Sequence, residues 1–225
     1  MRQLIWKDYR LTRPVLIVAF AVFVAIYGLG AAIEIQGSWP KLPSAAQWGS
    51  MLVAYGTIAL YMTFIVTALL GGHAIACERA DRSAHFLAYL PPTKLMIISS
   101  KLIVAAAATA VMFGWIVLTA CVLAPRLGAA SAEFTGGLTV RGAAMTCVLT
   151  FGVGWLASAK FDSALVPIIL AVASPVVVTL ALLTLARVLD IPNFEMAARA
   201  GPTCLWLGVI AFAAGTWLYA RRVEP

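Results

Sequence analysis

The chain has 225 residues, of which 63% are apolar and only 11% are Asp, Glu, Lys or Arg. Typical soluble domains have about 45–50% apolar and about 25% charged residues, so this composition excludes an ordinary soluble enzyme. The net charge of +7 also occurs in nucleic-acid-binding proteins, so the positions of the basic residues must be known before it is interpreted.

Residues 1–13 mix apolar and aromatic side chains with charged ones, including Trp6, Tyr9, Lys7 and Arg13. This mixture suits the headgroup region of a bilayer. We therefore expect a short interfacial helix over 1–13 that leads into a first membrane span.

Six stretches without Asp, Glu, Lys or Arg follow along the chain, each at least 18 residues long. A bilayer core about 30 Å thick needs about 20 apolar residues at about 1.5 Å per helical residue, so each stretch can cross as a helix. The predicted spans are about 14–33, 49–76, 102–125, 142–159, 163–186 and 200–220. The expected fold class is an all-α polytopic membrane protein, with one transmembrane domain over 1–225.

Six spans place both termini on the same side of the membrane. With the termini in the cytoplasm, eleven of the sixteen basic residues lie inside and five outside, which is the asymmetry of the positive-inside rule. We therefore expect both termini to be cytoplasmic, and the positive charge requires no nucleic-acid partner. The inside set is Arg2, Lys7, Arg10, Arg13, Arg79, Arg82, Lys94, Lys101, Lys160, Arg221 and Arg222; the outside set is Lys41, Arg126, Arg141, Arg187 and Arg199.

Small residues recur four apart at Ala106, Ala110 and Gly114 in the third span, and at Gly154 and Ser158 in the fourth. Such rows permit close helix contact in lipid. Small residues are also common in membrane helices, so both interpretations stay open.

Prolines and aromatic residues mark two further features of the spans. Pro167 and Pro175 are expected to interrupt the fifth span, because each removes a backbone donor. Trp155, Trp217 and Tyr219 fall near the predicted inner boundary, where aromatic belts occur.

The largest predicted cytoplasmic feature is the loop 78–101, with the sequence ERADRSAHFLAYLPPTKLMIISSK. On a helix, Glu78, Asp81, Arg82 and His85 share one face, and the diproline at 91–92 ends the helix. Such a helix can lie on the membrane surface or present a face to a cytoplasmic partner, and the residues alone favour neither.

The same loop resembles a segment of a known family. The order of residues along the loop resembles the E-R, F-L, L-P, basic, K pattern that follows the second span of type-2 ABC exporter permeases. The residues that carry this resemblance are Glu78-Arg79, Phe86-Leu87, Leu90-Pro91, Lys94 and Lys101. Those permeases are also similar to this chain in having an N-terminal interfacial helix, six spans and cytoplasmic termini.

The resemblance implies that the loop docks against a separate ATP-hydrolysing subunit, present in two copies, and transmits its closure to the spans. It also implies a second copy of this chain or a similar permease, because two sets of six spans are needed to enclose a pathway. The partner-coupling residues would be Glu78, Arg79, Asp81, Arg82, Phe86, Leu90 and Pro91.

No phosphate-binding loop of the form G-x-x-x-x-G-K-[ST] occurs, and no Gly-Lys pair occurs at all. Without the backbone cradle and the lysine for the phosphates, the chain is not expected to hydrolyse ATP. We expect no cofactor in this chain, and ATP and Mg²⁺ in the partner ATPase.

Catalytic and metal-binding patterns are weak. The two histidines, His73 and His85, are twelve residues apart, and neither H-E-x-x-H nor G-x-S-x-G is present. The predicted spans contain no charged residue of the kind that intramembrane enzymes or proton-coupled transporters place there. We expect no catalytic residue and no metal site, and we interpret His73 as an interfacial residue.

Uncharged polar residues in the second and fifth spans are the candidates for contact with a substrate. The resemblance places a substrate path near these spans, which would include Thr57, Tyr61, Ser174 and Thr179. The alternative is that Thr and Ser hydroxyls bond to the backbone of their own helices.

The leading hypothesis is the permease subunit of an ABC exporter, integral to the bacterial plasma membrane and in contact with its lipid. The alternative is a membrane scaffold or assembly factor that recruits a cytoplasmic partner without transport. The residues do not select the cargo among apolar compounds, peptides, lipids and glycans, or decide between a homodimer and a heterodimer.

Overall fold

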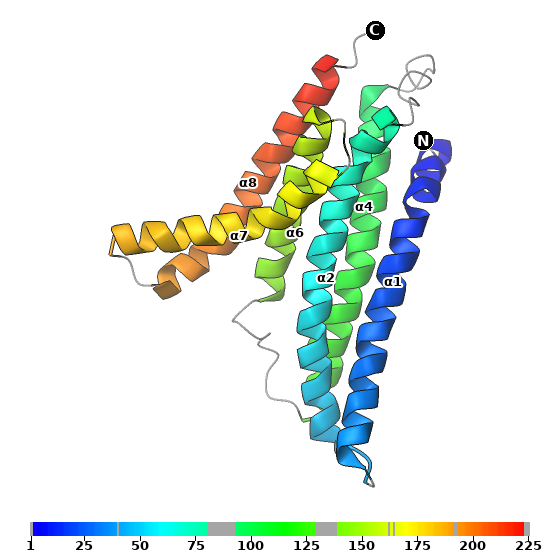
Figure 1. Ribbon diagram of the computed structural model, residues 1–225, viewed down its shortest axis with the longest axis vertical. Helices are drawn as coiled ribbons and strands as arrows, with labels where there is room; N and C mark the ends of the chain where they lie inside the picture. The colour runs from blue at the N-terminus through cyan, green and yellow to red at the C-terminus, as the bar shows by residue number, and fades with distance from the viewer. Residues whose placement is uncertain are drawn as a thin grey trace.

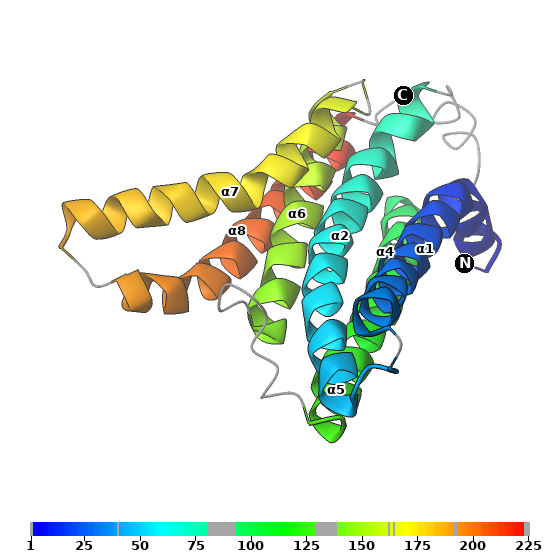
Figure 2. The same ribbon diagram turned by 60° about the horizontal axis from the view of Figure 1, so that its bottom comes forward.

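The computed structural model describes residues 2–39, 41–80, 93–128, 139–161, 163, 165–190 and 193–222. Within these ranges, only the backbone is described for 2–3, 77–80, 94, 193–198 and 222. The described chain is a bundle of long helices, with α7 projecting to one side (Figures 1 and 2).

The described residues form helices and no strand. The elements are α1 (Arg2–Ser38), α2 (Ala45–Ala80), α4 (Lys94–Ile116), η1 (Val117–Leu123), α5 (Ala124–Arg126), α6 (Val140–Lys160), α7 (Leu165–Val188) and α8 (Asn193–Arg222). The π-helix η1 joins α4 to α5 without a break, so the three form one long rod. Within the described ranges, six helical rods are long and apolar enough to cross a membrane, which confirms the predicted all-α fold and the number of spans.

The helix boundaries refine the predicted ones. Residues 2–13 are helical, but they continue through Pro14 into the first span as a single helix, so the expected interfacial segment is not a separate element. The fifth span begins at Leu165, two residues later than predicted.

The two prolines of α7 differ in their effect. Pro167 lies in the first turn, where backbone N–H groups have no partner within the helix in any case, so it does not interrupt the span as we had expected. Pro175 lies inside the helix, which nevertheless continues to Val188. Only three residues of α7 are buried, namely Pro167, Ala171 and Ala186.

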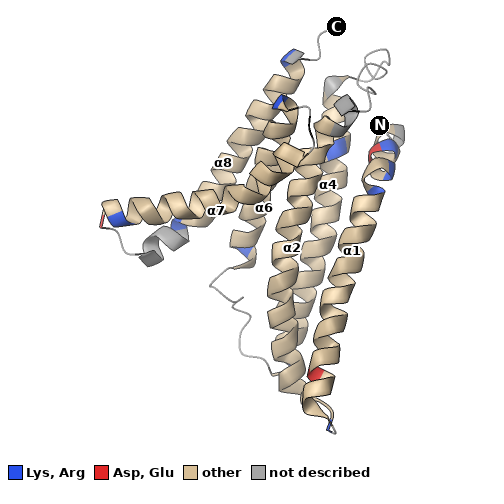
Figure 3. Cartoon of the chain, in the orientation of Figure 1, with Lys and Arg blue, Asp and Glu red and all other residues tan. Residues whose placement is uncertain are grey.

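Both termini lie at the same end of the bundle (Figure 1). Lys and Arg residues gather at the two ends of the helices, and the shafts between them are free of charge (Figure 3). This arrangement agrees with an even number of crossings. Which end faces the cytoplasm remains a prediction from the distribution of basic residues.

Helix α6 lies between α2 and α8 and touches both at glycines. A Cβ built on Gly154 would lie 2.8 Å from the backbone nitrogen of Gly72 in α2 and 3.2 Å from the carbonyl oxygen of Ala68. On α8, a Cβ built on Gly208 would lie 2.6 Å from the carbonyl oxygen of Val148 in α6. Backbone therefore meets backbone on two sides of α6, and side chains larger than hydrogen do not fit at these points.

The two predicted small-residue rows have opposite outcomes. Gly154 and Ser158 are buried at helix contacts. Ala106 and Ala110 are exposed on the surface of the chain, and a Cβ built on Gly114 would meet no atom within 4 Å. Only the row in the fourth span serves close packing within the described chain.

Trp155 is fully buried and does not belong to an aromatic belt, contrary to our expectation. Its ring packs against Phe151 and Phe212, with centroid separations of 6.0 and 5.4 Å. The ring can be buried because Gly215 on α8 has no side chain. A Cβ built there would lie only 2.7 Å from Trp155 Cδ1. Trp217 is 53% exposed and stacks under the Arg221 guanidinium at 3.9 Å, as an interfacial aromatic residue does.

We predict that Gly154→Leu prevents close packing of α2 on α6, whereas the matched change Gly114→Leu is tolerated. Overpacking costs about 1–3 kcal/mol even where side chains can move, and here the neighbours are backbone atoms. At Gly114 the space is open, and leucine has the higher helix propensity. Thermal unfolding of the two purified variants in detergent measures the difference, and equal Tm values would contradict the packing argument.

Candidate functional site

The predicted partner-coupling residues lie mostly outside the described residues. Glu78 and Arg79 belong to the last turns of α2, where only the backbone is described. The other five, Asp81, Arg82, Phe86, Leu90 and Pro91, lie outside the described ranges altogether. Both ends of the 78–101 segment are helical, because α2 extends to Ala80 and α4 begins at Lys94. Thr93 caps α4 by accepting a hydrogen bond from the backbone nitrogen of Met96 at 3.4 Å.

The polar contacts of the predicted substrate-path residues are made within their own helices. The hydroxyls of Thr57, Ser174 and Thr179 donate to carbonyls of their own helices, at 3.0, 2.8 and 2.8 Å. Tyr61 is 51% exposed and contacts Phe64 edge to face. No hydrogen bond in the described part of the chain joins the two α2 residues to the two α7 residues, and the hydroxyls follow the local-bonding alternative.

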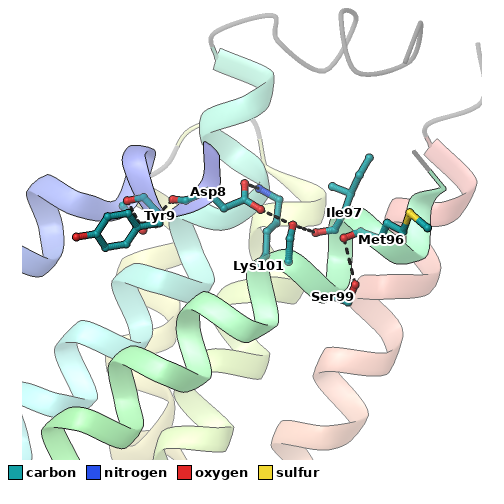
Figure 4. A network of polar contacts seen from close by, with 8 residues as sticks. Asp8, Tyr9, Met96, Ile97, Ser99 and Lys101 are labelled. Carbon is teal, nitrogen blue, oxygen red and sulfur yellow. Dashed lines mark hydrogen bonds and ion pairs between the residues drawn. The ribbon is translucent and has the colours of Figure 1, made fainter. Parts of the chain in front are cut away.

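The strongest polar feature is a buried charged cluster at the end of the bundle that carries the termini (Figure 4). Asp8 of α1 is 5% exposed, and Ser100 of α4 is fully buried. Asp8 Oδ2 accepts a hydrogen bond from Ser100 Oγ, and Asp8 Oδ1 lies 3.6 Å from Lys101 Nζ. One carboxylate therefore ties α1 to the beginning of α4.

The local backbone supports this arrangement. Thr12 Oγ1, one turn after Asp8, donates to the Asp8 carbonyl at 2.9 Å. Ser100 Oγ lies 2.9 Å from the Ile97 carbonyl, so this hydroxyl is held by its own helix as well as by Asp8. Two charges with little contact with water need such partners, because an unpaired buried charge is costly.

A small cavity of about 40 Å³ adjoins the cluster. Its lining brings together Asp8, Thr12, Lys101 and the half-buried His73 of α2. A water molecule needs roughly 10–15 Å³ of such space, so the cavity can hold water but no organic substrate. The cluster is therefore suited to linking three helices. The cavity beside it is too small to be a transport pathway.

In the sequence, Asp8 belongs to the predicted headgroup segment 1–13, Lys101 to the loop pattern and His73 to the interface. Nothing in their spacing shows that they meet. One feature of the sequence does single out Asp8 as a residue with a specific partner, since it is the only acidic residue before position 34. Its partner could not be found from spacing, because Asp8 and Ser100 are separated by 92 positions.

Two further polar links join helices within the bundle. Tyr27 of α1 and Thr119 of η1 share a hydrogen bond of 3.1 Å, and Thr67 of α2 and Thr150 of α6 share one of 2.8 Å. Cys147 and Cys204 are buried and free. Across the described residues, no group of three or more His, Cys, Asp or Glu side chains could hold a metal ion.

We predict that Asp8→Leu destabilises the chain by about 3–5 kcal/mol, because Lys101 then lacks its carboxylate in a buried site. Adding Lys101→Met removes the charge that Asp8 faced, and the double variant should recover much of the loss. Glu34→Leu, at the opposite end of α1, is the control. Thermal unfolding in detergent measures all three, and a double variant no more stable than Asp8→Leu would show that the charge pair is not the cause.

Among protein-family models, curated proteins and solved structures, none matches this chain. The likeness to exporter permeases rests on the residues of the 78–101 segment and on the helical plan.

Proposed function

We propose that this protein is the membrane-spanning permease subunit of an ABC exporter in the bacterial plasma membrane. A separate ATPase, in two copies, binds ATP and Mg²⁺ and supplies the energy. A second copy of this chain, or a similar permease, completes the pathway.

The observation that carries the proposal is the position of the 78–101 segment. It connects α2 to α4 at the end of the bundle that holds both termini. Its last residue, Lys101, contacts Asp8 of α1. Movement of this segment therefore acts directly on α2 and α4, and through the buried ion pair on α1.

The packing of α2 offers a route to the remaining helices. Gly72 of α2 approaches Gly154 of α6 at backbone distance and also lies against Ile168 of α7. An ATPase that closes against the segment would thus move helices that are already in tight contact. Flexible side chains would absorb little of that movement.

The proposal is tested by co-expressing the chain with an ATPase encoded by a neighbouring gene and purifying through a tag on the chain. We predict that the ATPase is retained. The double charge reversal Glu78→Lys with Arg82→Glu should reduce retention at least tenfold, because it inverts the charges presented to the partner. Co-purified ATPase activity per mole of chain is the measurement.

The matched control is charge reversal at the far end of the bundle, Arg126→Glu, which should leave retention unchanged. Failure of any neighbouring ATPase to co-purify, together with unchanged transport in the double variant, would overturn the proposal. A retained ATPase that no transported compound stimulates would favour the scaffold alternative instead.

A further inference from the structure

A long apolar groove runs between α1 and α4 on the outside of the bundle, with a volume of about 1250 Å³. Every residue that lines it is aliphatic, aromatic or methionine. Trp6, Tyr9, Leu16 and Phe20 contribute from α1, and Ala107 and Val111 from α4.

The groove extends over about half of the membrane. The α1 lining runs from Ile5 to Phe20, a rise of about 22 Å at about 1.5 Å per residue, and the part beyond the aromatic pair Trp6 and Tyr9 accounts for about 16 Å of it. One leaflet of a hydrocarbon core about 30 Å thick is about 15 Å deep. A helix from another protein copy would cross both leaflets, whereas an acyl chain occupies one, so the depth of the groove favours a lipid.

The terminal end of the groove has the composition of a headgroup site. The rings of Trp6 and Tyr9 lie 5.7 Å apart there and are 64% and 41% exposed. Arg13 is exposed and, at four residues after Tyr9 and three before Leu16, lies on the same side of α1 as the groove. Aromatic rings and snorkelling arginines are the side chains that proteins place at headgroup level.

The charge at this end favours an anionic headgroup. Arg10 is exposed beside Arg13. Among the described side chains, the acidic residue nearest to them along α1 is Asp8, which is buried and paired with Lys101 and so does not offset the exposed arginines. Basic residues next to the membrane attract anionic lipids by about 1 kcal/mol each.

We propose that this groove binds an acyl chain of an anionic phospholipid from the leaflet on the side of the termini, with the headgroup beside Arg13. The site does not depend on the proposed transport function. It differs from general lipid contact in having a concave apolar channel that begins at a basic and aromatic mouth.

The test uses the full chain reconstituted in vesicles with equimolar phosphatidylglycerol and phosphatidylcholine of identical acyl chains. After extraction in mild detergent, native mass spectrometry counts the lipids that remain bound to each protein. Wild type should retain phosphatidylglycerol in preference to phosphatidylcholine. Ala107→Phe should reduce total retention several-fold, because the ring fills the groove.

Arg13→Gln should lower the preference for phosphatidylglycerol about fivefold, the factor that corresponds to about 1 kcal/mol for one arginine, and leave acyl-chain binding in place. Ala25→Phe is the matched control for bulk, since Ala25 is an exposed α1 residue outside the lining of the groove. Arg126→Gln, at the far end, is the matched control for charge. Both controls should behave as wild type.

Equal retention by Ala107→Phe and Ala25→Phe would overturn the groove as the binding site. Equal retention of the two phospholipids by wild type would overturn the anionic headgroup. If Ala107→Phe instead converts a dimer to a monomer, the occupant is a second copy and the proposal is wrong. The oligomeric state read from the same mass spectra distinguishes these outcomes and confirms that each variant is folded enough to remain monodisperse.

Discussion

Close backbone contact around α6 is the constraint on which the rest of the bundle depends. Lipid tails are as apolar as leucine, so burial of apolar surface does not drive helices together in a bilayer, and packing must do so. In α6, Gly152 and Gly154 are two residues apart and therefore point to opposite sides of the helix. Gly152 lies against Gly208 of α8 and Gly154 against Gly72 of α2. One short glycine pair thus positions three spans.

Charge imposes a second constraint at the end of the bundle. The shafts carry no Asp, Glu, Lys or Arg, yet Asp8 and Lys101 lie in a site at their end where water has little access. Such a pair contributes little net stability, but removing either partner is costly in a site with so little water. Its effect is therefore to fix which turn of α1 meets which turn of α4. Together with the Tyr27–Thr119 bond further along α1, it holds the first and third spans in register.

Composition and charge spacing sufficed to predict the number and approximate limits of the spans, because bilayer thickness dictates the length of each apolar stretch. Contacts between spans were not predictable in the same way. Gly154 and Gly114 look alike in the sequence, but only Gly154 faces another helix. The position of Trp155 in the sequence is typical of an aromatic belt residue. Its burial depends on Gly215, sixty positions later, which has no side chain to occupy the space of the ring. The pairing of Asp8 with Ser100 and Lys101 likewise depends on how separate helices meet.

The ion pair and the apolar groove involve the same two helices, and this links them physically. The pair joins α1 and α4 next to Tyr9, in the part of the groove nearest the terminal end, so it sets the separation of the groove walls there. A lipid chain bound in the groove contacts both walls and stabilises the arrangement in which the pair is formed. Conversely, a displacement of α4 that stretches the contact between Asp8 and Lys101 widens the groove and weakens lipid binding. By the reciprocity of linked equilibria, an anionic phospholipid in this groove would resist that displacement with the same free energy.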